Sequence, residues 1–348
     1  MDLKSEVEVL APFRLEPKFV QRIWGTADLR PWYDFVSDGK ADPIGEVWLT
    51  GDDCKVVTGP LKGSTLGEVF AGHSKAMMGE GVPESAQGAS PLLLKVIFAK
   101  EKLSVQVHPD DRLARKYGQP RGKTECWYTL AAERGAEVAA GLKPGVTLET
   151  VEREVADGTL ESSLEVLPVA AGDMVFVDAG TVHAIWPGSV LLETQQNCDI
   201  TYRLFDYGRP RELHVAKALE AIRLVTNAGK EAPLELVDRT VLVDRDYFCV
   251  EKIRVEGSRT GKSMDRTPVD HLAERLLGRQ FAGLQYLFAA NGSGRVLAAD
   301  AEAFEAVELP SRGLLAVPAL SPDWLIEDLG ALELIRITPR WPANEVTA

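Results

Sequence analysis

The stretch EKLSVQVHPDD, residues 101–111, alternates apolar and polar side chains in the way that a half-buried strand does. One face carries a leucine and two valines. The other face carries a hydroxyl, an amide and an imidazole, from Ser104, Gln106 and His108. Solvent-facing strand positions more often carry charged or hydroxyl side chains. The amide and the imidazole two residues apart therefore predict a strand whose polar face lines a site.

The same strand pattern recurs through the chain, which contains 30 glycines and 20 prolines between short runs rich in aliphatic and aromatic residues. Runs of this kind, separated by turn residues, are typical of a mostly β protein. Helical spacing is found at residues 64–79, 147–166 and 212–225. The first of these begins with a capping box from Thr65 to Glu68. We expect two β-barrel or jelly-roll units, the first enlarged by helical insertions in the N-terminal half.

A charged and polar stretch, NAGKEAPLELVDR, precedes a second set of strand-like runs. Such a stretch suits a domain boundary, so we expect one domain over residues 1–235 and a smaller β domain over residues 236–348. No repeat at solenoid or propeller spacing is visible, which argues against a repeat array. The second domain contains a single histidine, His271, and no cluster of potential ligands. We therefore expect it to lack a metal site.

The composition limits the class of protein. The chain has 348 residues, of which 45% are hydrophobic, and a formal net charge of -13. The negative charge argues against binding to nucleic acid or to an anionic membrane surface. The sequence has no apolar run long enough for a transmembrane helix and no basic, apolar leader, which favours a soluble cytoplasmic protein. The four cysteines are scattered, so neither a disulfide framework nor a CxxC metal site is indicated.

Two further segments carry groups that could bind a metal ion. The strand-like run GKTECWYTL would project Lys123 and Glu125 from one face. In GDMVFVDAGTVHAI, small residues allow a tight hairpin that aims His183 inward. An amide oxygen, two imidazoles and a carboxylate could then meet at one metal ion, from Gln106, His108, Glu125 and His183. Buried, hydrogen-bonded polar residues without a metal are the alternative that the spacing leaves open.

Several motifs in order along the chain resemble those of the type I phosphomannose isomerases, in particular their shorter bacterial branch. The motifs are PKFVQRIWG, IGEVWL, VQVHPDD, GKTECWY, DAGTVHAI and ETQQNCDITYRLFDYGRPRELH. The resemblance implies two cupin-type jelly-roll barrels and one Zn²⁺ per chain, bound in the first barrel. The implied zinc ligands are the four residues already assembled, Gln106, His108, Glu125 and His183.

The sequence departs from the wider patterns at three places. Asp178 stands where proline is usual in the second cupin motif, and Gln106 with His108 replaces the usual His-x-His pair. Both departures agree with the isomerase branch. The segment LFDYGRPREL replaces a basic motif of the longer family members, so the resemblance leaves the phosphate contacts of that motif open here. Arg209 and Arg211 add local positive charge, although a solvated loop is the plainer interpretation of this pair.

The resemblance implies an enzyme that interconverts mannose 6-phosphate and fructose 6-phosphate through an enediol. A metal with only one anionic ligand would keep charge to stabilise the reacting oxygens. We assign Arg203 to the developing oxyanion or to the substrate phosphate. Lys123 would transfer a proton or bind the anion, and Ser104 would donate to the anion. Glu193 and Asp199 would supply the catalytic base, and their alternative role is a structural salt bridge to Arg203.

Two other classes of function stay open at this point. A non-catalytic sugar-binding bicupin would be expected to lose a metal ligand or Arg203, and the sequence retains all of them. Another metal-dependent cupin, such as an iron-dependent oxygenase, would more naturally carry a His-x-His set. For the leading interpretation we expect a small-molecule hexose phosphate as the partner, neither nucleic acid nor membrane, and a monomer or a homodimer.

Overall fold

The computed structural model of the chain describes the residues in the ranges 9–37, 43–80, 82–83, 86–255, 259–260 and 283–342. These residues form a mostly β structure, which confirms the fold class predicted from the sequence. None of their helices is long and apolar enough to cross a membrane. The chain divides into two compact units. Unit 1 comprises Met1–Lys18, Leu49–Pro91 and Pro233–Ala348, and unit 2 comprises Phe19–Trp48 and Leu92–Ala232.

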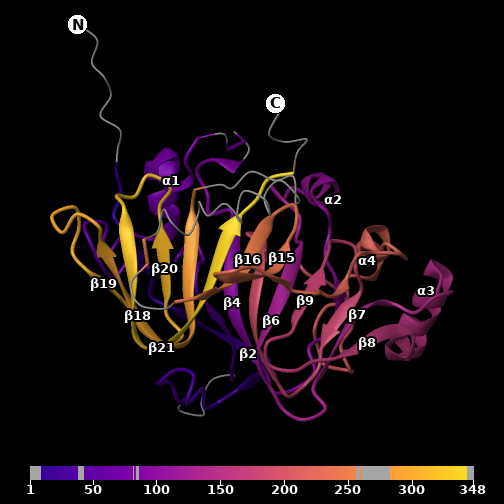
Figure 1. The fold of residues 1–348 in the computed structure, drawn as a ribbon. Coiled ribbons are helices and arrows are strands. Elements are labelled where there is room, and N and C mark those ends of the chain that lie inside the picture. The colour runs from indigo at the N-terminus through magenta and orange to yellow at the C-terminus, as the bar shows by residue number, and fades with distance from the viewer. Residues whose placement is uncertain are drawn as a thin grey trace, which may run out of the picture. The chain divides into compact units, whose positions relative to one another are not determined.

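Unit 1 contains one antiparallel sheet, in the order β1-β20-β18-β21-β16-β15-β14, with β17 on β21 and β19 on β18. The long strands β18 and β21 pair along most of their length (Figure 1). One face of the sheet buries an apolar cluster that includes Leu287, Leu315 and Leu334. The strands are β1 (Phe13–Arg14), β14 (Leu234–Glu235), β15 (Arg239–Asp244), β16 (Phe248–Arg254), β17 (Arg259–Thr260), β18 (Gln285–Ala298), β19 (Val307–Leu309), β20 (Leu314–Val317) and β21 (Trp324–Pro339).

Unit 2 contains two antiparallel sheets. The larger has the order β13-β9-β6-β11-β4-β3-β2, and the smaller has the order β12-β5-β10-β7-β8. The strands of the larger sheet are β2 (Lys18–Thr26), β3 (Ile44–Trp48), β4 (Leu92–Ala99), β6 (Glu125–Ala132), β9 (Met174–Val177), β11 (Ser189–Gln196) and β13 (Gly229–Lys230). Those of the smaller sheet are β5 (Val105–Val107), β7 (Glu137–Leu142), β8 (Leu164–Pro168), β10 (His183–Ile185) and β12 (Tyr202–Phe205).

The two sheets of unit 2 face each other, because side chains from both contribute to one buried cluster. Ile97, Trp127 and Leu191 come from the larger sheet, and Val138 and Ile185 come from the smaller sheet. The resulting space between the sheets is apolar over much of its area. Polar side chains that enter it are therefore costly unless they have partners or a function.

The strand predicted within residues 101–111 has its two faces in different environments. Val105 and Val107 of β5 lie in the cluster that packs under the helices, on the outer side of the smaller sheet. Gln106 points to the opposite side because successive strand residues alternate. The strand is shorter than predicted, and Leu103, which precedes it, belongs to the cluster between the sheets. The polar face of β5 thus lines the interior of unit 2.

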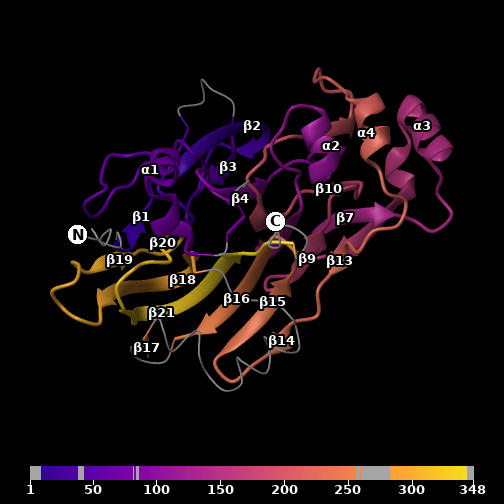
Figure 2. The ribbon, with the colours of Figure 1, turned by 90° about the horizontal axis from the view of Figure 1, so that it is seen from above.

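Four α-helices lie within the described residues: α1 (Leu66–Met78), α2 (Asp111–Lys116), α3 (Leu148–Asp157) and α4 (Val215–Ala221). The predicted capping box of α1 is confirmed, since Thr65 Oγ1 accepts from the Glu68 amide and Glu68 Oε2 accepts from the Thr65 amide. Helices α3 and α4 lie beside β7 (Figures 1 and 2), and their buried Val151 and Ala218 pack with Val105 and Val107.

The prediction of one helix over residues 147–166 is wrong in its second half. Helix α3 ends at Gly158, which has a φ of 71° and so takes the left-handed conformation that terminates helices. A 3₁₀ turn, Leu160–Ser163, and strand β8 follow. Leu160 and Leu164 lie in this second half. They fill the cluster beneath the smaller sheet.

The predicted domain boundary at residue 235 stays a prediction. The last segment of unit 1 begins at Pro233, close to that position. However, the segments Met1–Lys18 and Leu49–Pro91 belong to the same compact unit as the C-terminal strands, through pairs such as β1 with β20. The predicted lack of a metal site in residues 236–348 rests partly on His271, which lies outside the described residues.

Candidate metal centre and substrate pocket

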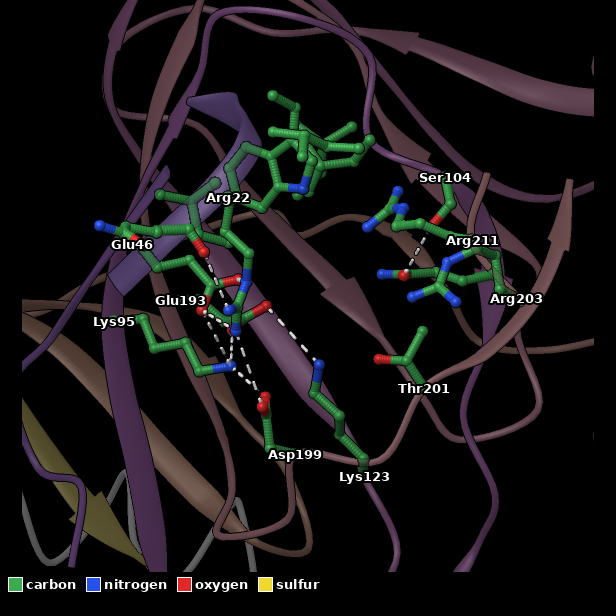
Figure 3. A pocket seen from close by; sticks show the side chains of 17 residues that line it. Arg22, Glu46, Lys95, Ser104, Lys123, Glu193, Asp199, Thr201, Arg203 and Arg211 are labelled. Carbon is green, nitrogen blue, oxygen red and sulfur yellow. Dashed lines mark hydrogen bonds and ion pairs between the residues drawn. The ribbon is translucent and has the colours of Figure 1, made fainter. Parts of the chain in front are cut away.

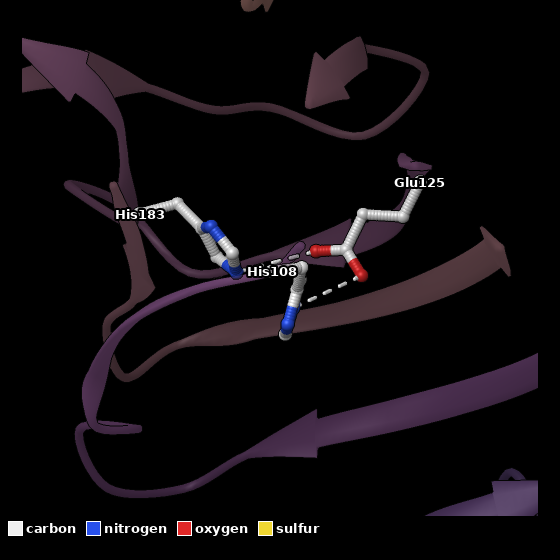
Figure 4. A group of neighbouring side chains, drawn as sticks. All are labelled: His108, Glu125 and His183. Carbon is white, nitrogen blue, oxygen red and sulfur yellow. Dashed lines mark ion pairs between the residues drawn. The ribbon is translucent and has the colours of Figure 1, made fainter. Parts of the chain in front are cut away.

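Three of the four predicted metal ligands converge between the sheets of unit 2. His108 follows β5, Glu125 begins β6 and His183 begins β10, and all three are buried. The His183 Nε2 atom lies 3.4 Å from Glu125 Oε1, and His108 Nε2 lies 3.6 Å from Glu125 Oε2 (Figure 4). Their potential ligand atoms all lie within 4.8 Å of one another. This geometry could hold one metal ion.

The chemistry of the three groups fits a divalent cation. The buried Glu125 carboxylate forms an ion pair with Lys123 through Oε2, and neither of its oxygens accepts a hydrogen bond of good geometry within the described residues. The Nδ1 atom of His183 lies 2.9 Å from the Thr181 carbonyl oxygen, so Nδ1 carries the proton and Nε2 offers a lone pair to the centre. Burial lowers the pKa of His183 to about 4 and that of His108 well below its ordinary value. Both imidazoles are therefore neutral near pH 7, as metal ligands must be.

Gln106, the fourth predicted ligand, lies next to this group. It is the cross-strand partner of His183, and its Nε2 atom lies 3.2 Å from His183 Nε2. Its Oε1 atom accepts a hydrogen bond from Ser104 Oγ at 3.3 Å. A half-turn of the Gln106 amide about its last side-chain bond would exchange Oε1 and Nε2. The oxygen, which can bind a metal ion, would then face the histidines.

Lys123 adds a cation to the same place. Its Nζ atom lies 2.8 Å from Glu125 Oε2, 3.1 Å from His108 Nε2 and 4.0 Å from Glu193 Oε1. Burial acts to lower the pKa of Lys123, but the carboxylates of Glu125 and Glu193 outweigh it and hold that pKa above its usual value. The ammonium group is thus charged at neutral pH and sits between the metal ligands and the carboxylate of Glu193.

Gln106 and Lys123 also line a cavity of about 440 Å³ in unit 2. One part of its wall carries a network of charges around Lys95 of β4 (Figure 3). The Lys95 Nζ atom lies 2.6 Å from Asp199 Oδ1, 3.5 Å from Glu193 Oε2 and 3.8 Å from Glu46 Oε2. Burial acts to lower the pKa of Lys95, but these three carboxylates outweigh it, so its pKa is raised.

Two acids in this network have pKa values that are shifted in opposite directions. Burial raises the pKa of Glu193 to about 7, even though Lys123 and Lys95 act in the opposite direction. Burial also acts to raise the pKa of Asp199, but Lys95 and Lys123 outweigh it there and the pKa is lowered. Both acids pair with Lys95. The alternative prediction of a salt bridge between either acid and Arg203 is wrong for the residues that the structure describes.

Arg22, Glu46 and Lys95 also line the pocket, although none of them was predicted as a site residue. Arg22 donates two hydrogen bonds to Glu46, each 3.0 Å long, and Trp48 donates its indole N–H to the same carboxylate at 2.6 Å. A signal was present, because Lys95 is the one charge in the apolar run LLLKVIFA and Glu46 is alone in IGEVW. A charge in the middle of a buried strand indicates a partner or a site.

A pair of arginines lies elsewhere in the cavity wall. Arg203 of β12 is the cross-strand partner of Gln106, so Arg203, Gln106 and His183 follow one another across three neighbouring strands. Arg211 lines the same cavity, close to Ser104 and Arg203 in Figure 3. Burial and the neighbouring Arg211 lower the pKa of Arg203. The interpretation of Arg211 as part of a solvated loop is therefore wrong, since its side chain forms part of the pocket.

The turn before His183 is attached to the other metal-ligand segments. The Gly180 amide donates to the His108 carbonyl oxygen at 2.9 Å, and the Ala179 amide donates to Thr124 Oγ1 at 3.3 Å. Gly180 has a φ of +92°, and a Cβ placed on it would lie 2.7 Å from Arg223 Cγ. The turn thus requires glycine both for its backbone conformation and for the close approach of Arg223.

Replacing Gly180 by alanine is expected to weaken the binding of added Zn²⁺, used as a probe of the candidate metal centre, about tenfold or more, because the turn that orients His183 must shift. Gly172→Ala is the matched control, since Gly172 has a φ of +94° but open space around its Cβ position. Both variants should lose about 1 kcal/mol of stability from the backbone. Competition with a zinc indicator measures the affinity. Equal zinc affinities for the two variants would contradict this role of the turn.

Comparisons with known proteins agree with the geometry of the site. The family model for the type I phosphomannose isomerase catalytic domain matches residues 12–145. Mannose-6-phosphate isomerase of Streptococcus mutans is 35% identical over 260 residues, which are 71% of this chain and 80% of the relative. Mannose-6-phosphate isomerase of Bacillus subtilis is 35% identical over 267 residues, which are 72% of this chain and 82% of the relative.

Solved structures give a similar result. The crystal structure of mannose 6-phosphate isomerase from Bacillus subtilis matches with a TM-score of 0.77 and 29% identity, over 94% of this chain and 99% of that one. A variant of phosphomannose isomerase from Salmonella typhimurium matches with a TM-score of 0.72 over 95% of this chain and 100% of that chain. Its identity is 15%, so this second match bears on the fold alone.

Proposed function

The chain belongs to the type I phosphomannose isomerases, and from this premise we propose that it interconverts mannose 6-phosphate and fructose 6-phosphate with one bound Zn²⁺. The observation that carries the proposal is the buried group of His108, Glu125 and His183 beside a cavity lined by cations and acids. Such a pocket suits a small anionic substrate whose oxygens must be stabilised during proton transfer. We further propose the two cupin-type barrels and the cytoplasmic location that the family resemblance implies.

Zinc suits the donor set. Two neutral imidazoles and one carboxylate leave a net charge of +1 around Zn²⁺ and leave room for substrate oxygens, with the Gln106 amide oxygen as the fourth protein ligand. When bound, the metal would polarise the oxygens at C1 and C2 of the open-chain sugar and stabilise the negative charge of the enediol step. The hydrogen bond from His183 Nδ1 to the Thr181 carbonyl oxygen fixes the direction in which this ligand points.

The proton transfer between C1 and C2 requires a group that can accept a proton and return it. Glu193 supports this role better than Asp199, because its pKa of about 7 suits both steps near neutral pH. Asp199, with its lowered pKa and its contact to Lys95, is better suited to holding that ammonium group in place. Lys123 lies between Glu193 and the metal ligands, where it could donate to a substrate oxygen.

The substrate phosphate would lie toward the arginines. Arg203 donates Nη1 to the Glu212 carbonyl oxygen, and no carboxylate among the described residues forms an ion pair with it. An arginine in a pocket wall without such a partner suits an anionic substrate group. The hydroxyl of Ser104 lies in the same wall and is a further donor. A non-catalytic sugar-binding protein would not need the group of metal ligands that the pocket retains.

Removal of the metal tests the proposal. In a coupled assay that converts mannose 6-phosphate to fructose 6-phosphate, chelation is expected to reduce turnover about 100-fold or more, because metal polarisation contributes several kcal/mol to such steps. Addition of Zn²⁺ to the dialysed protein should restore it. Activity that is indifferent to the chelator would exclude the metal mechanism. No turnover of any hexose phosphate by zinc-loaded protein would favour the sugar-binding alternative.

A further inference from the structure

The turn after β12 holds a buried carboxylate between two arginines. Asp206 is 2% exposed, and Arg211 donates to it through Nε at 2.6 Å and through Nη2 at 2.7 Å. Arg209 Nη2 lies 2.8 Å from Asp206 Oδ1. The planar guanidinium of Arg211 meets the carboxylate with two parallel hydrogen bonds, which fixes its orientation as well as its position.

The two arginines have different surroundings. Arg209 donates its Nη2 to the Lys102 carbonyl oxygen at 2.8 Å and does not line the cavity. Arg211 lines the cavity together with Arg203. Because Nε and Nη2 of Arg211 face Asp206, its Nη1 atom remains as a donor to a group in the pocket. The buried Asp206 carboxylate thus contacts both arginines. Arg209 connects the turn to the Lys102 carbonyl oxygen, and Arg211 is directed to the pocket.

Further contacts hold the turn in an unusual conformation. Tyr207 and Gly208 have φ values of 55° and 77°. An aromatic residue takes a positive φ only where surrounding contacts require it. The Tyr207 hydroxyl donates to Glu161 Oε1 at 3.0 Å, and Lys102 Nζ lies 5.1 Å from the centre of the Tyr207 ring. The segment that replaces the basic motif of longer family members is therefore held in a defined conformation by side-chain contacts.

We propose that Asp206 is a positioning residue that orients Arg211 toward the phosphate group of the substrate, so that Arg203 and Arg211 bind this phosphate together. The inference rests on the proposed function and adds a residue that recognises the phosphorylated end of the sugar. Two guanidinium groups beside each other repel, and the buried carboxylate offsets that repulsion when the pocket is empty. An arginine that is already oriented loses less conformational freedom when the anion binds.

The test compares Asp206→Asn and Arg211→Gln in the zinc-loaded enzyme. Each variant is expected to raise KM for mannose 6-phosphate about 10- to 100-fold with kcat nearly unchanged, as for the loss of one or two hydrogen bonds to a charged group. Calorimetric titration with inorganic phosphate should show the same loss of affinity. Adding Asp206→Asn to Arg211→Gln should cost less than about twofold more, because Asp206 acts through Arg211.

Two further variants serve as a surface control and as a conservative substitution. Asp28→Asn removes a similar two-point pair with Arg30 on the exposed surface, and should leave KM and phosphate affinity unchanged. Arg211→Lys keeps the positive charge but loses the planar guanidinium that binds an anion at two points. This variant should raise KM even if Asp206→Asn does not fold.

Unchanged KM and phosphate affinity in folded Asp206→Asn would overturn the inference, as would a full additional loss in the double variant. Failure of the proposed function gives a different result. Zinc-loaded wild type would then not turn over hexose phosphates, while weaker binding of inorganic phosphate by Asp206→Asn would still support the role of Asp206.

Discussion

For the proposed zinc centre, replacing His108 by alanine is expected to lower kcat/KM for mannose 6-phosphate about 1,000-fold or more and to reduce bound zinc to a small fraction of one per chain. His108 supplies one of the two imidazoles at the centre, and its ring is 2% exposed. Without it the carboxylate of Glu125, the imidazole of His183 and the proposed amide ligand Gln106 remain, a set with only one imidazole that should bind zinc far more weakly. The lost activity corresponds to the several kcal/mol that a metal contributes to stabilising developing charge.

Metal analysis of the purified variant, together with the coupled assay, measures both effects. His73→Ala is the control, because His73 lies on α1 in unit 1, outside the metal centre. It should retain zinc and activity. Circular dichroism establishes whether His108→Ala is folded. A folded His108→Ala protein with one zinc per chain and normal turnover would contradict the assignment of this ligand.

Replacing Lys95 by methionine is expected to lower the free energy of unfolding by about 3 kcal/mol near pH 7. The side chain of Lys95 is 2% exposed and lies within ion-pair distance of Glu46, Glu193 and Asp199. Removing the cation leaves carboxylates with no compensating charge, which typically costs about 3–5 kcal/mol for a buried pair. The lower end of that range applies because the Asp199 side chain is 43% exposed and water screens it.

Urea denaturation of both proteins as a function of pH measures this loss. Lys95 and its neighbouring cations hold the pKa values of Glu46 and Asp199 below their usual values against the effect of burial. The stabilisation from these two groups is therefore present above their unfolded-state pKa values and is lost as the pH falls through the lowered folded-state values. The difference between Lys95→Met and wild type should accordingly be largest near neutral pH and shrink on acidification.

Lys230→Met is the matched control for this prediction. Lys230 forms a salt bridge with Asp173, and their side chains are 38% and 30% exposed. Its loss should cost less than about 1 kcal/mol, as for other solvent-exposed pairs. A Lys95→Met protein that is as stable as the control at every pH would show that the network does not stabilise unit 2.

The metal-ligand residues were accessible from the sequence because each lies in a segment with a local signal. The alternation in EKLSVQVHPDD indicates which side of the strand Gln106 occupies, and the small residues before His183 indicate a turn. These signals depend on a few neighbouring residues. The same local reasoning failed after Gly158, where an apolar pattern suited both a helix and the strand that forms.

The amino-acid sequence by itself determined a mostly β chain, the residues that could bind a metal and the family to which they point. Only the tertiary structure decided which charges meet. Lys95 joins Glu46 and Asp199, which are far apart in the chain, and Arg203 lies across from Gln106. The physical reason is that side-chain alternation within a strand is a local property. The partners of a buried charge are set by strand register and sheet packing, which depend on contacts along the whole chain.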